Sequence, residues 1–130
     1  MKKIIYTPHA PAPIGPYSQG VLVGQTLYVS GQIALDPLSG ALKQADVETE
    51  TRQVMRNLMA IVEAAGLGTE DIVKCSIFLT DMNLFAEVNA IYGEWFGTHA
   101  PARETVEVAA LPKGAKVEVS CVAVLGSPNA

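Results

Sequence analysis

The sequence predicts an α+β fold in which one mixed β-sheet carries two helices on a single face. Short β-branched and apolar runs near both ends predict strands, and two amphipathic stretches between them have helical spacing. The expected order of elements is β-β-β-α-β-α-β-β within one domain that covers residues 1–130. Because strand–helix–strand connections are right-handed, both helices should lie on the same face of the sheet. No helix remains for the opposite face, so its apolar residues predict self-association.

Three strands are expected in the N-terminal third of the chain. Residues 2–6 predict a short edge strand, and residues 8–17 predict an extended loop, because their four prolines lack the backbone N–H that a sheet needs. Two strands follow, joined by a tight hairpin at Gly24-Gln25. The segment DPLSG, residues 36–40, predicts a turn.

Two helices and three further strands complete the chain. The first helix should run from about residue 46 to residue 65, with Asp46 as its N-cap and Gly66 beyond its end. Residues 72–80 are apolar on both faces and predict an interior strand. The second helix, at about residues 83–96, has an aromatic stripe and ends before Gly97. The segment PARETVEVAALPKGAKVEVSC, residues 101–121, supplies the last two strands and the turn between them.

Composition narrows the class of function. With 49% hydrophobic and 17% charged residues, the chain is not disordered and has little polar surface, which favours an oligomer. The net charge is −4 and basic residues do not cluster, so we expect no nucleic-acid partner. Cys75 and Cys121 have neither metal-ligand nor CxxC spacing, which predicts buried, reduced thiols, no metal site and a cytoplasmic location. We expect neither a signal peptide nor a membrane span, because no apolar run approaches roughly 20 residues.

The candidate chemistry lies in the last two strands, since motifs such as GxSxG, HExxH and the P-loop are absent. Arg103 and Glu118 each stand on a polar strand face. One interpretation is a solvated face with surface ion pairs. The other is a guanidinium that binds a carboxylate, beside a carboxylate that moves protons for a water. A simple hairpin centred near Lys113 would hold the two roughly 17 Å apart. To share a small substrate, they must lie on strands that are not direct neighbours or come from different subunits.

Longer segments resemble the RidA family, also called YjgF-type enamine/imine deaminases. They cover nearly the whole chain in order: IGPYSQG (14–20), VSGQIALDP (29–37), AAG (64–66), VKCSIFLTDMNLFAEVNAIYGEWF (73–96) and PARETVEVAALPKGAKVEV (101–119). The resemblance implies a chorismate-mutase-like homotrimer with clefts between subunits and no cofactor. It also implies hydrolysis of 2-imino acids, such as 2-iminobutanoate and 2-iminopropanoate, to 2-oxo acids and ammonia. These imines arise from enamines, such as 2-aminoacrylate, that pyridoxal-phosphate dehydratases release.

The resemblance also implies roles for individual positions. Arg103 matches the arginine that binds the substrate carboxylate, and Glu118 matches the acid that orients or activates the attacking water. The other matching positions line the cleft or lie beside it: Tyr17, Ser30, Gly31, Phe85, Asn89 and Thr105. Thr105 stands where many members have cysteine, so thiol chemistry is impossible at this position.

Two other functions remain open from the sequence. One is a non-catalytic trimer that binds or senses 2-oxo acids or other small carboxylates through the same arginine. The other comes from older associations of the family with RNA cleavage and translation inhibition, and the acidic composition weighs against it. From the residues alone, Tyr17 and Phe85 could also be core aromatics, and Ser30 could be a small strand residue.

Overall fold

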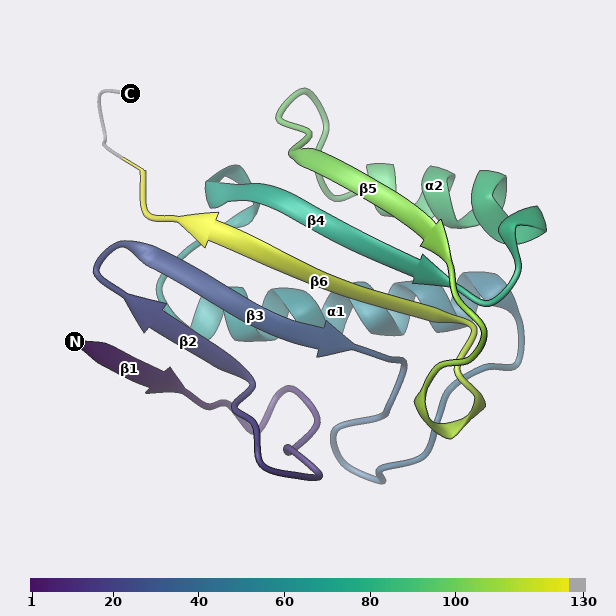
Figure 1. The fold of residues 1–130 in the computed structure, drawn as a ribbon, viewed down its shortest axis with the longest axis horizontal. Coiled ribbons are helices and arrows are strands. Elements are labelled where there is room, and N and C mark those ends of the chain that lie inside the picture. The colour runs from purple at the N-terminus through teal and green to yellow at the C-terminus, as the bar shows by residue number, and fades with distance from the viewer. Residues whose placement is uncertain (127–130) are drawn as a thin grey trace.

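The computed structural model of the chain describes residues 1–126, which form one six-stranded sheet and two α-helices (Figure 1). The elements are β1 (Lys2–Ile5), β2 (Gly20–Val23), β3 (Thr26–Gln32), α1 (Val47–Ala64), β4 (Ile72–Leu79), α2 (Phe85–Gly93), β5 (Ala102–Glu107) and β6 (Val117–Val124). The predicted order of strands and helices is confirmed. Helix α2 is shorter than predicted at both ends. Met82–Leu84 form a separate 3₁₀ turn, in which the Asp81 side chain accepts a hydrogen bond from the backbone N–H of Asn83, and the chain after Gly93 continues in turns.

The strands lie in the order β1-β2-β3-β6-β4-β5, and every neighbouring pair is antiparallel except β4 and β5. The last strand therefore enters the middle of the sheet. Because β4 separates β5 from β6, the simple hairpin centred near Lys113 does not form, and the two strands are not direct neighbours. The pattern of β6 suits this interior position, since Val117, Val119, Cys121 and Ala123 are all buried.

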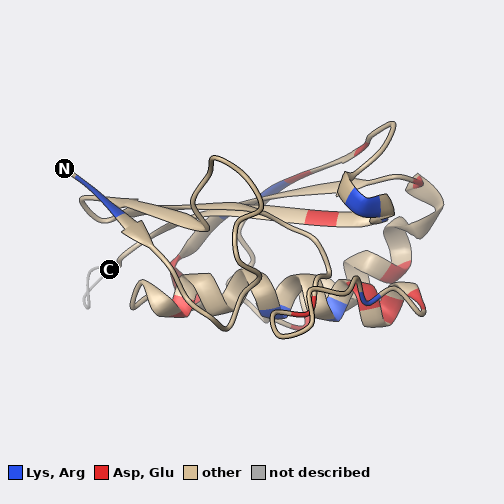
Figure 2. Ribbon diagram, turned by 90° about the horizontal axis from the view of Figure 1, so that it is seen from below, with Lys and Arg blue, Asp and Glu red and all other residues tan. Residues whose placement is uncertain are grey.

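Both helices lie on one side of the sheet, as predicted (Figure 2). Helix α1 begins after Asp46, whose side chain accepts a 2.7 Å hydrogen bond from the backbone N–H of Thr49, and Gly66 follows its end at φ +85°. It packs against β3, β6 and α2. No helix within residues 1–126 covers the opposite face of the sheet, and Tyr28 and Val106 are exposed on it. We call this surface the open face.

The core lies between the sheet and the helices. Cys75 and Cys121 face each other there across β4 and β6, and both thiols are free and buried, as predicted. Burial raises the pKa of each thiol, so neither is a ready nucleophile. Helix α1 also buries four polar side chains, those of Glu50, Thr51, Gln53 and Asn57. No helix within residues 1–126 combines the length and the apolar character that crossing a membrane requires.

Candidate active site

The proposed site residues form two groups on opposite faces of the sheet. Glu118 alternates with the buried Val117 and Val119, so it points to the open face. Arg103 is the register partner of the fully buried Cys75, so it points to the face that the helices cover. Tyr17 and Gly31 line one cavity with Glu118, and Ser30 precedes Gly31 in β3 without lining that cavity. Phe85 and Asn89 contact Arg103, and Thr105 lies on the same face of β5. We call these two groups the acid half-site and the arginine half-site.

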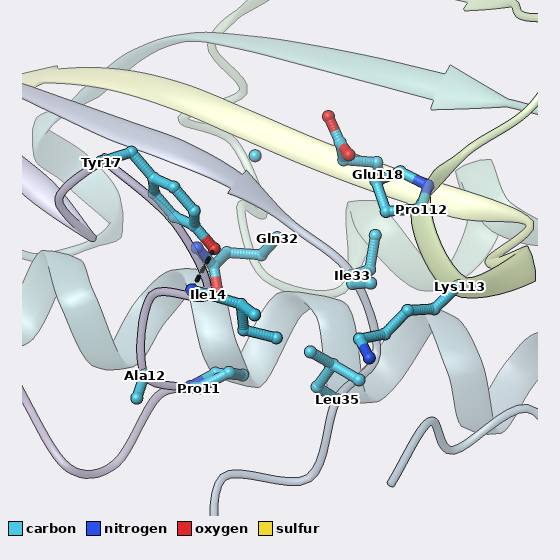
Figure 3. A pocket seen from close by; sticks show the side chains of 11 residues that line it. Pro11, Ala12, Ile14, Tyr17, Gln32, Ile33, Leu35, Pro112, Lys113 and Glu118 are labelled. Carbon is cyan, nitrogen blue, oxygen red and sulfur yellow. Dashed lines mark hydrogen bonds between the residues drawn. The ribbon is translucent and has the colours of Figure 1, made fainter. Parts of the chain in front are cut away.

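The acid half-site is centred on a cavity of about 310 Å³ between β3, β6 and the Pro-rich loop (Figure 3). The Glu118 carboxylate lies against Gly31, where a Cβ atom would come within 2.7 Å of Glu118 Cδ. A side chain at position 31 would therefore displace the carboxylate. Burial is the one influence on the Glu118 carboxyl, and it raises the pKa of that group. A carboxylate with a raised pKa accepts a proton more readily than an ordinary glutamate does.

Tyr17 and Ser30 join the Pro-rich loop to this cavity. The Tyr17 ring is 51% exposed and lines the cavity, so Tyr17 is not a core aromatic. Its hydroxyl accepts a 3.3 Å hydrogen bond from the backbone N–H of Ile14. The Ser30 hydroxyl donates a 2.5 Å hydrogen bond to the backbone oxygen of Ser18. Ser30 therefore holds the loop that carries Tyr17, and it is more than a small strand residue.

The arginine half-site holds a guanidinium between two aromatic rings and an amide. Arg103 Cζ lies 5.6 Å from the centre of the Phe85 ring and 5.1 Å from that of Tyr92, within cation–π range. Arg103 Nη1 donates a 2.6 Å hydrogen bond to Asn89 Oδ1. No ion pair among residues 1–126 involves Arg103, so its other N–H groups can bind an anion. Phe85 is 37% exposed beside it and is not a core aromatic.

Tyr92 belongs to this half-site, although its position in the apolar stripe of the second helix predicted a core residue. Phe85, Asn89 and Tyr92 stand at positions i, i+4 and i+7 of α2, which puts all three on one helix face. Because the resemblance to the family had already placed Asn89 beside the cleft, this spacing could have indicated that Tyr92 lies there too. Thr105 lies on the same face of β5 as Arg103, and its buried Oγ1 makes no hydrogen bond within residues 1–126.

The two half-sites of one chain are too far apart for one small substrate. Arg103 of β5 pairs in register with Cys75 of β4, which in turn pairs with Cys121 of β6. Glu118 lies three residues before Cys121 in β6. Two strand spacings of about 4.8 Å and three residues of about 3.4 Å each separate the Cα atoms by roughly 14 Å. The side chains also point to opposite faces. Among residues 1–126, no group of three or more His, Cys, Asp or Glu side chains is placed to hold a metal ion.

Comparison with known proteins identifies the family. Residues 7–125 match the family model described as Endoribonuclease L-PSP. The chain belongs to the RidA/YjgF family. Human 2-iminobutanoate/2-iminopropanoate deaminase is 45% identical to it over 126 residues, which are 97% of this chain and 92% of the human protein. The predicted family is thereby confirmed.

Solved structures of the RidA/YjgF family confirm the fold. The YjgF gene product of E. coli is 50% identical and superposes with a TM-score of 0.90, over 95% of this chain and 99% of that one. E. coli TdcF, solved with bound serine, is 45% identical and has a TM-score of 0.91, over 95% of this chain and 99% of that one. The six-stranded mixed sheet with two helices on one face is therefore the fold of this family.

Proposed function

We propose that this RidA/YjgF protein is a deaminase that hydrolyses 2-imino acids, such as 2-iminobutanoate and 2-iminopropanoate, to 2-oxo acids and ammonia. We further propose that it acts as a homotrimer in the cytoplasm and uses no cofactor. The observation that carries the proposal is the pair of half-sites, one with an anion-binding guanidinium and one with a proton-accepting carboxylate. The open face of the sheet offers an apolar surface for subunit contact. Because Arg103 stands on the edge strand β5, we propose that this edge of one subunit meets the acid half-site of the next.

The reaction needs only binding, orientation and proton transfer. Arg103 binds the planar carboxylate of the substrate through its free N–H groups. Glu118 accepts a proton from a water as the water oxygen bonds to the iminium carbon, which gives a neutral carbinolamine. Glu118 then returns that proton to the amine nitrogen. The C–N bond breaks, the hydroxyl oxygen forms the carbonyl, and its proton leaves with ammonia as ammonium.

The other residues have supporting roles in this proposal. Asn89, Phe85 and Tyr92 fix the guanidinium, and Gly31 leaves room for the carboxylate. Tyr17 lines the cavity in which the imino acid would lie, and the loop held by Ser30 positions it. Thr105 shares the strand face of Arg103 and completes the arginine half-site in this proposal. The deaminase name carried by the human relative supports this reaction.

A second candidate is a protein that binds small amino or oxo acids without turnover. The observation that favours it is the serine bound to the related TdcF. Both candidates use the same arginine. RNA cleavage, which the name of the family model suggests, ranks below both, because the net charge is −4 and the basic residues are scattered.

A coupled assay tests the proposed reaction. Threonine dehydratase generates 2-iminobutanoate, and the release of 2-oxobutanoate is followed with and without the protein. We expect Arg103→Ala to lower kcat/KM by about 10–100-fold, since a hydrogen bond to a charged group contributes roughly 1.5–3 kcal/mol. Arg56→Ala, which removes an exposed arginine from α1, is the matched control and should leave the rate unchanged. Full activity of Arg103→Ala would refute the proposal, and 2-oxobutanoate binding without turnover would favour the second candidate.

A further inference from the structure

The cavity of the acid half-site is larger than a methyl or ethyl side chain requires. Its volume of about 310 Å³ lies at the lower end of the range for sites that enclose drug-sized ligands, roughly 300–1,000 Å³. Ile14, Ile33 and Leu35 form an apolar wall in it. A 2-iminobutanoate placed with its reacting carbon at Glu118 would leave most of this wall uncovered. The cavity therefore has room for an imino acid with a longer side chain.

Lys113 lines the same cavity from a strained backbone position. Its φ of +58° makes it the one residue other than glycine with positive φ among residues 1–126. Lysine adopts this region at a cost that glycine does not have, and such strain is often found where a side chain is needed. The turn is closed by the backbone N–H of Ala115, which donates a 3.1 Å hydrogen bond to the oxygen of Pro112. The fold thus holds the base of the Lys113 side chain at the rim of the cavity.

The ends of the cavity carry opposite charges. In Figure 3 the Lys113 side chain runs toward Leu35, away from the carboxylate of Glu118. In that view Ile33 lies between the ammonium group and the carboxylate, and Leu35 lies beside the ammonium group. Lys113 takes part in none of the ion pairs among residues 1–126. A ligand that matches this layout has its reacting centre at Glu118, an apolar stem, and an anionic group at its far end.

The geometry points to Lys113 as a specificity-determining residue that selects dicarboxylic 2-imino acids, the class that includes 2-iminoglutarate. This inference rests on the proposed function and names the substrate class of the same site. The 2-carboxylate binds Arg103 of the adjoining subunit, and the imine carbon lies at Glu118. The methylene groups cover Ile33 and Leu35, and the terminal carboxylate pairs with the Lys113 ammonium. Hydrolysis then follows the same proton transfers and yields a dicarboxylic 2-oxo acid and ammonium.

The test compares two imines of similar length that differ in terminal charge. 2-Iminoglutarate and 2-iminohexanoate are generated in situ by amino-acid oxidases, and the imine that remains is trapped with semicarbazide. The measured quantity is the ratio of kcat/KM for 2-iminoglutarate to that for 2-iminohexanoate. We expect a ratio above one for the natural chain, and a ratio lowered about two- to fivefold by Lys113→Met, in keeping with an exposed ion pair. Lys113→Arg should keep the preference, and high salt should reduce it.

Controls separate this inference from the proposed function. Lys116→Met removes an exposed lysine three positions away that does not line the cavity, and it should leave the ratio unchanged. An unchanged ratio in Lys113→Met, or an equal drop in Lys116→Met, would overturn the role of Lys113. If the natural chain hydrolyses 2-iminobutanoate in that case, the proposed function survives alone. If it hydrolyses none of the three imines, both fail.

Discussion

Glu118 is a half-buried carboxyl whose pKa is raised by burial, and this one property affects both activity and stability. The proposed proton transfer requires the carboxylate form, so the rate should fall as the pH drops through the raised pKa. The folded state disfavours that same charged form. The side chain therefore lowers stability once the pH rises through the pKa of the folded state, and has no such effect below the pKa of the unfolded chain.

Replacing Glu118 with glutamine should separate these two effects. We expect Glu118→Gln to lose most of its turnover while Tm rises at neutral pH, because the half-buried negative charge is then removed. The gain in Tm should shrink as the pH falls and disappear below the ordinary range for glutamate, about 4. Thermal unfolding at a series of pH values measures it. A Tm gain that is the same at every pH would show that burial of the charge is not the cause.

Sequence reasoning at the residue scale singles out positions where the charge itself is unusual. Arg103 and Glu118 stood out because each interrupts a run of small and β-branched residues. Tyr92 was missed because an aromatic residue at helical spacing is indistinguishable from a core residue until a cation is found above its ring. Gly31 leaves room for the Glu118 carboxylate because β3 lies next to β6. No local sequence pattern shows which strand is the neighbour of β6.

At the scale of elements, α1 supports the walls of the acid half-site with buried polar side chains. Asn57 donates hydrogen bonds to the backbone oxygens of Ile33 at 3.0 Å and Leu35 at 2.8 Å, and both residues line the cavity. Gln53 donates to Asn57 Oδ1 at 2.8 Å. One oxygen of Glu50 accepts from the backbone N–H groups of the two residues that precede Glu118, at 2.7 and 3.2 Å. The helix thus positions both sides of the cavity.

Asn57→Leu should weaken the fold and loosen the cavity together. The change leaves the buried backbone oxygen of Leu35 without its donor and the amide of Gln53 without its acceptor, whereas the oxygen of Ile33 keeps a 2.8 Å hydrogen bond from the backbone N–H of Leu35. We expect these losses to lower the free energy of unfolding by roughly 2–4 kcal/mol. KM should rise more than kcat falls, because the displaced wall binds substrate and moves no proton. Urea unfolding at fixed protein concentration and steady-state kinetics measure the two effects. Arg56→Leu, at the exposed neighbour, should change stability by no more than about 0.5 kcal/mol. If Asn57→Leu is destabilised but keeps the KM of the natural chain, Asn57 does not position the wall of the cavity.

The elements themselves were predictable and their arrangement was less so. Strands and helices follow from local patterns, namely alternating apolar residues and helical spacing. The turn at Gly24, the N-cap at Asp46 and the helix end at Gly66 are also local, and the structure confirms each one. The insertion of β6 between β3 and β4 is a long-range choice, decided by which strand can bury a complete face. The sequence did not show which face of the sheet Arg103 points to, because the edge strand β5 carries charged residues on both faces.

At the scale of the whole molecule, one chain holds both halves of the proposed site and cannot join them. The half-sites lie on opposite faces of the sheet, with Cα atoms of Arg103 and Glu118 roughly 14 Å apart. In a cyclic trimer each of the three clefts would take Arg103 from one subunit and Glu118 from the next. Activity should then depend on having the two residues in neighbouring subunits, and it should not require them in the same chain.

Mixed trimers of two inactive variants test this arrangement directly. Arg103→Ala and Glu118→Gln proteins are unfolded together in equal amounts and refolded. A cleft is complete when an arginine-bearing subunit (chance one half) meets a glutamate-bearing neighbour (chance one half). We therefore expect about one quarter of the activity of refolded natural protein, in keeping with random cyclic assembly. Each variant refolded alone, and the two mixed without unfolding, should stay near their own low rates. If the co-refolded mixture is no more active than its components while size measurements show mixed trimers, the site does not combine residues of two subunits.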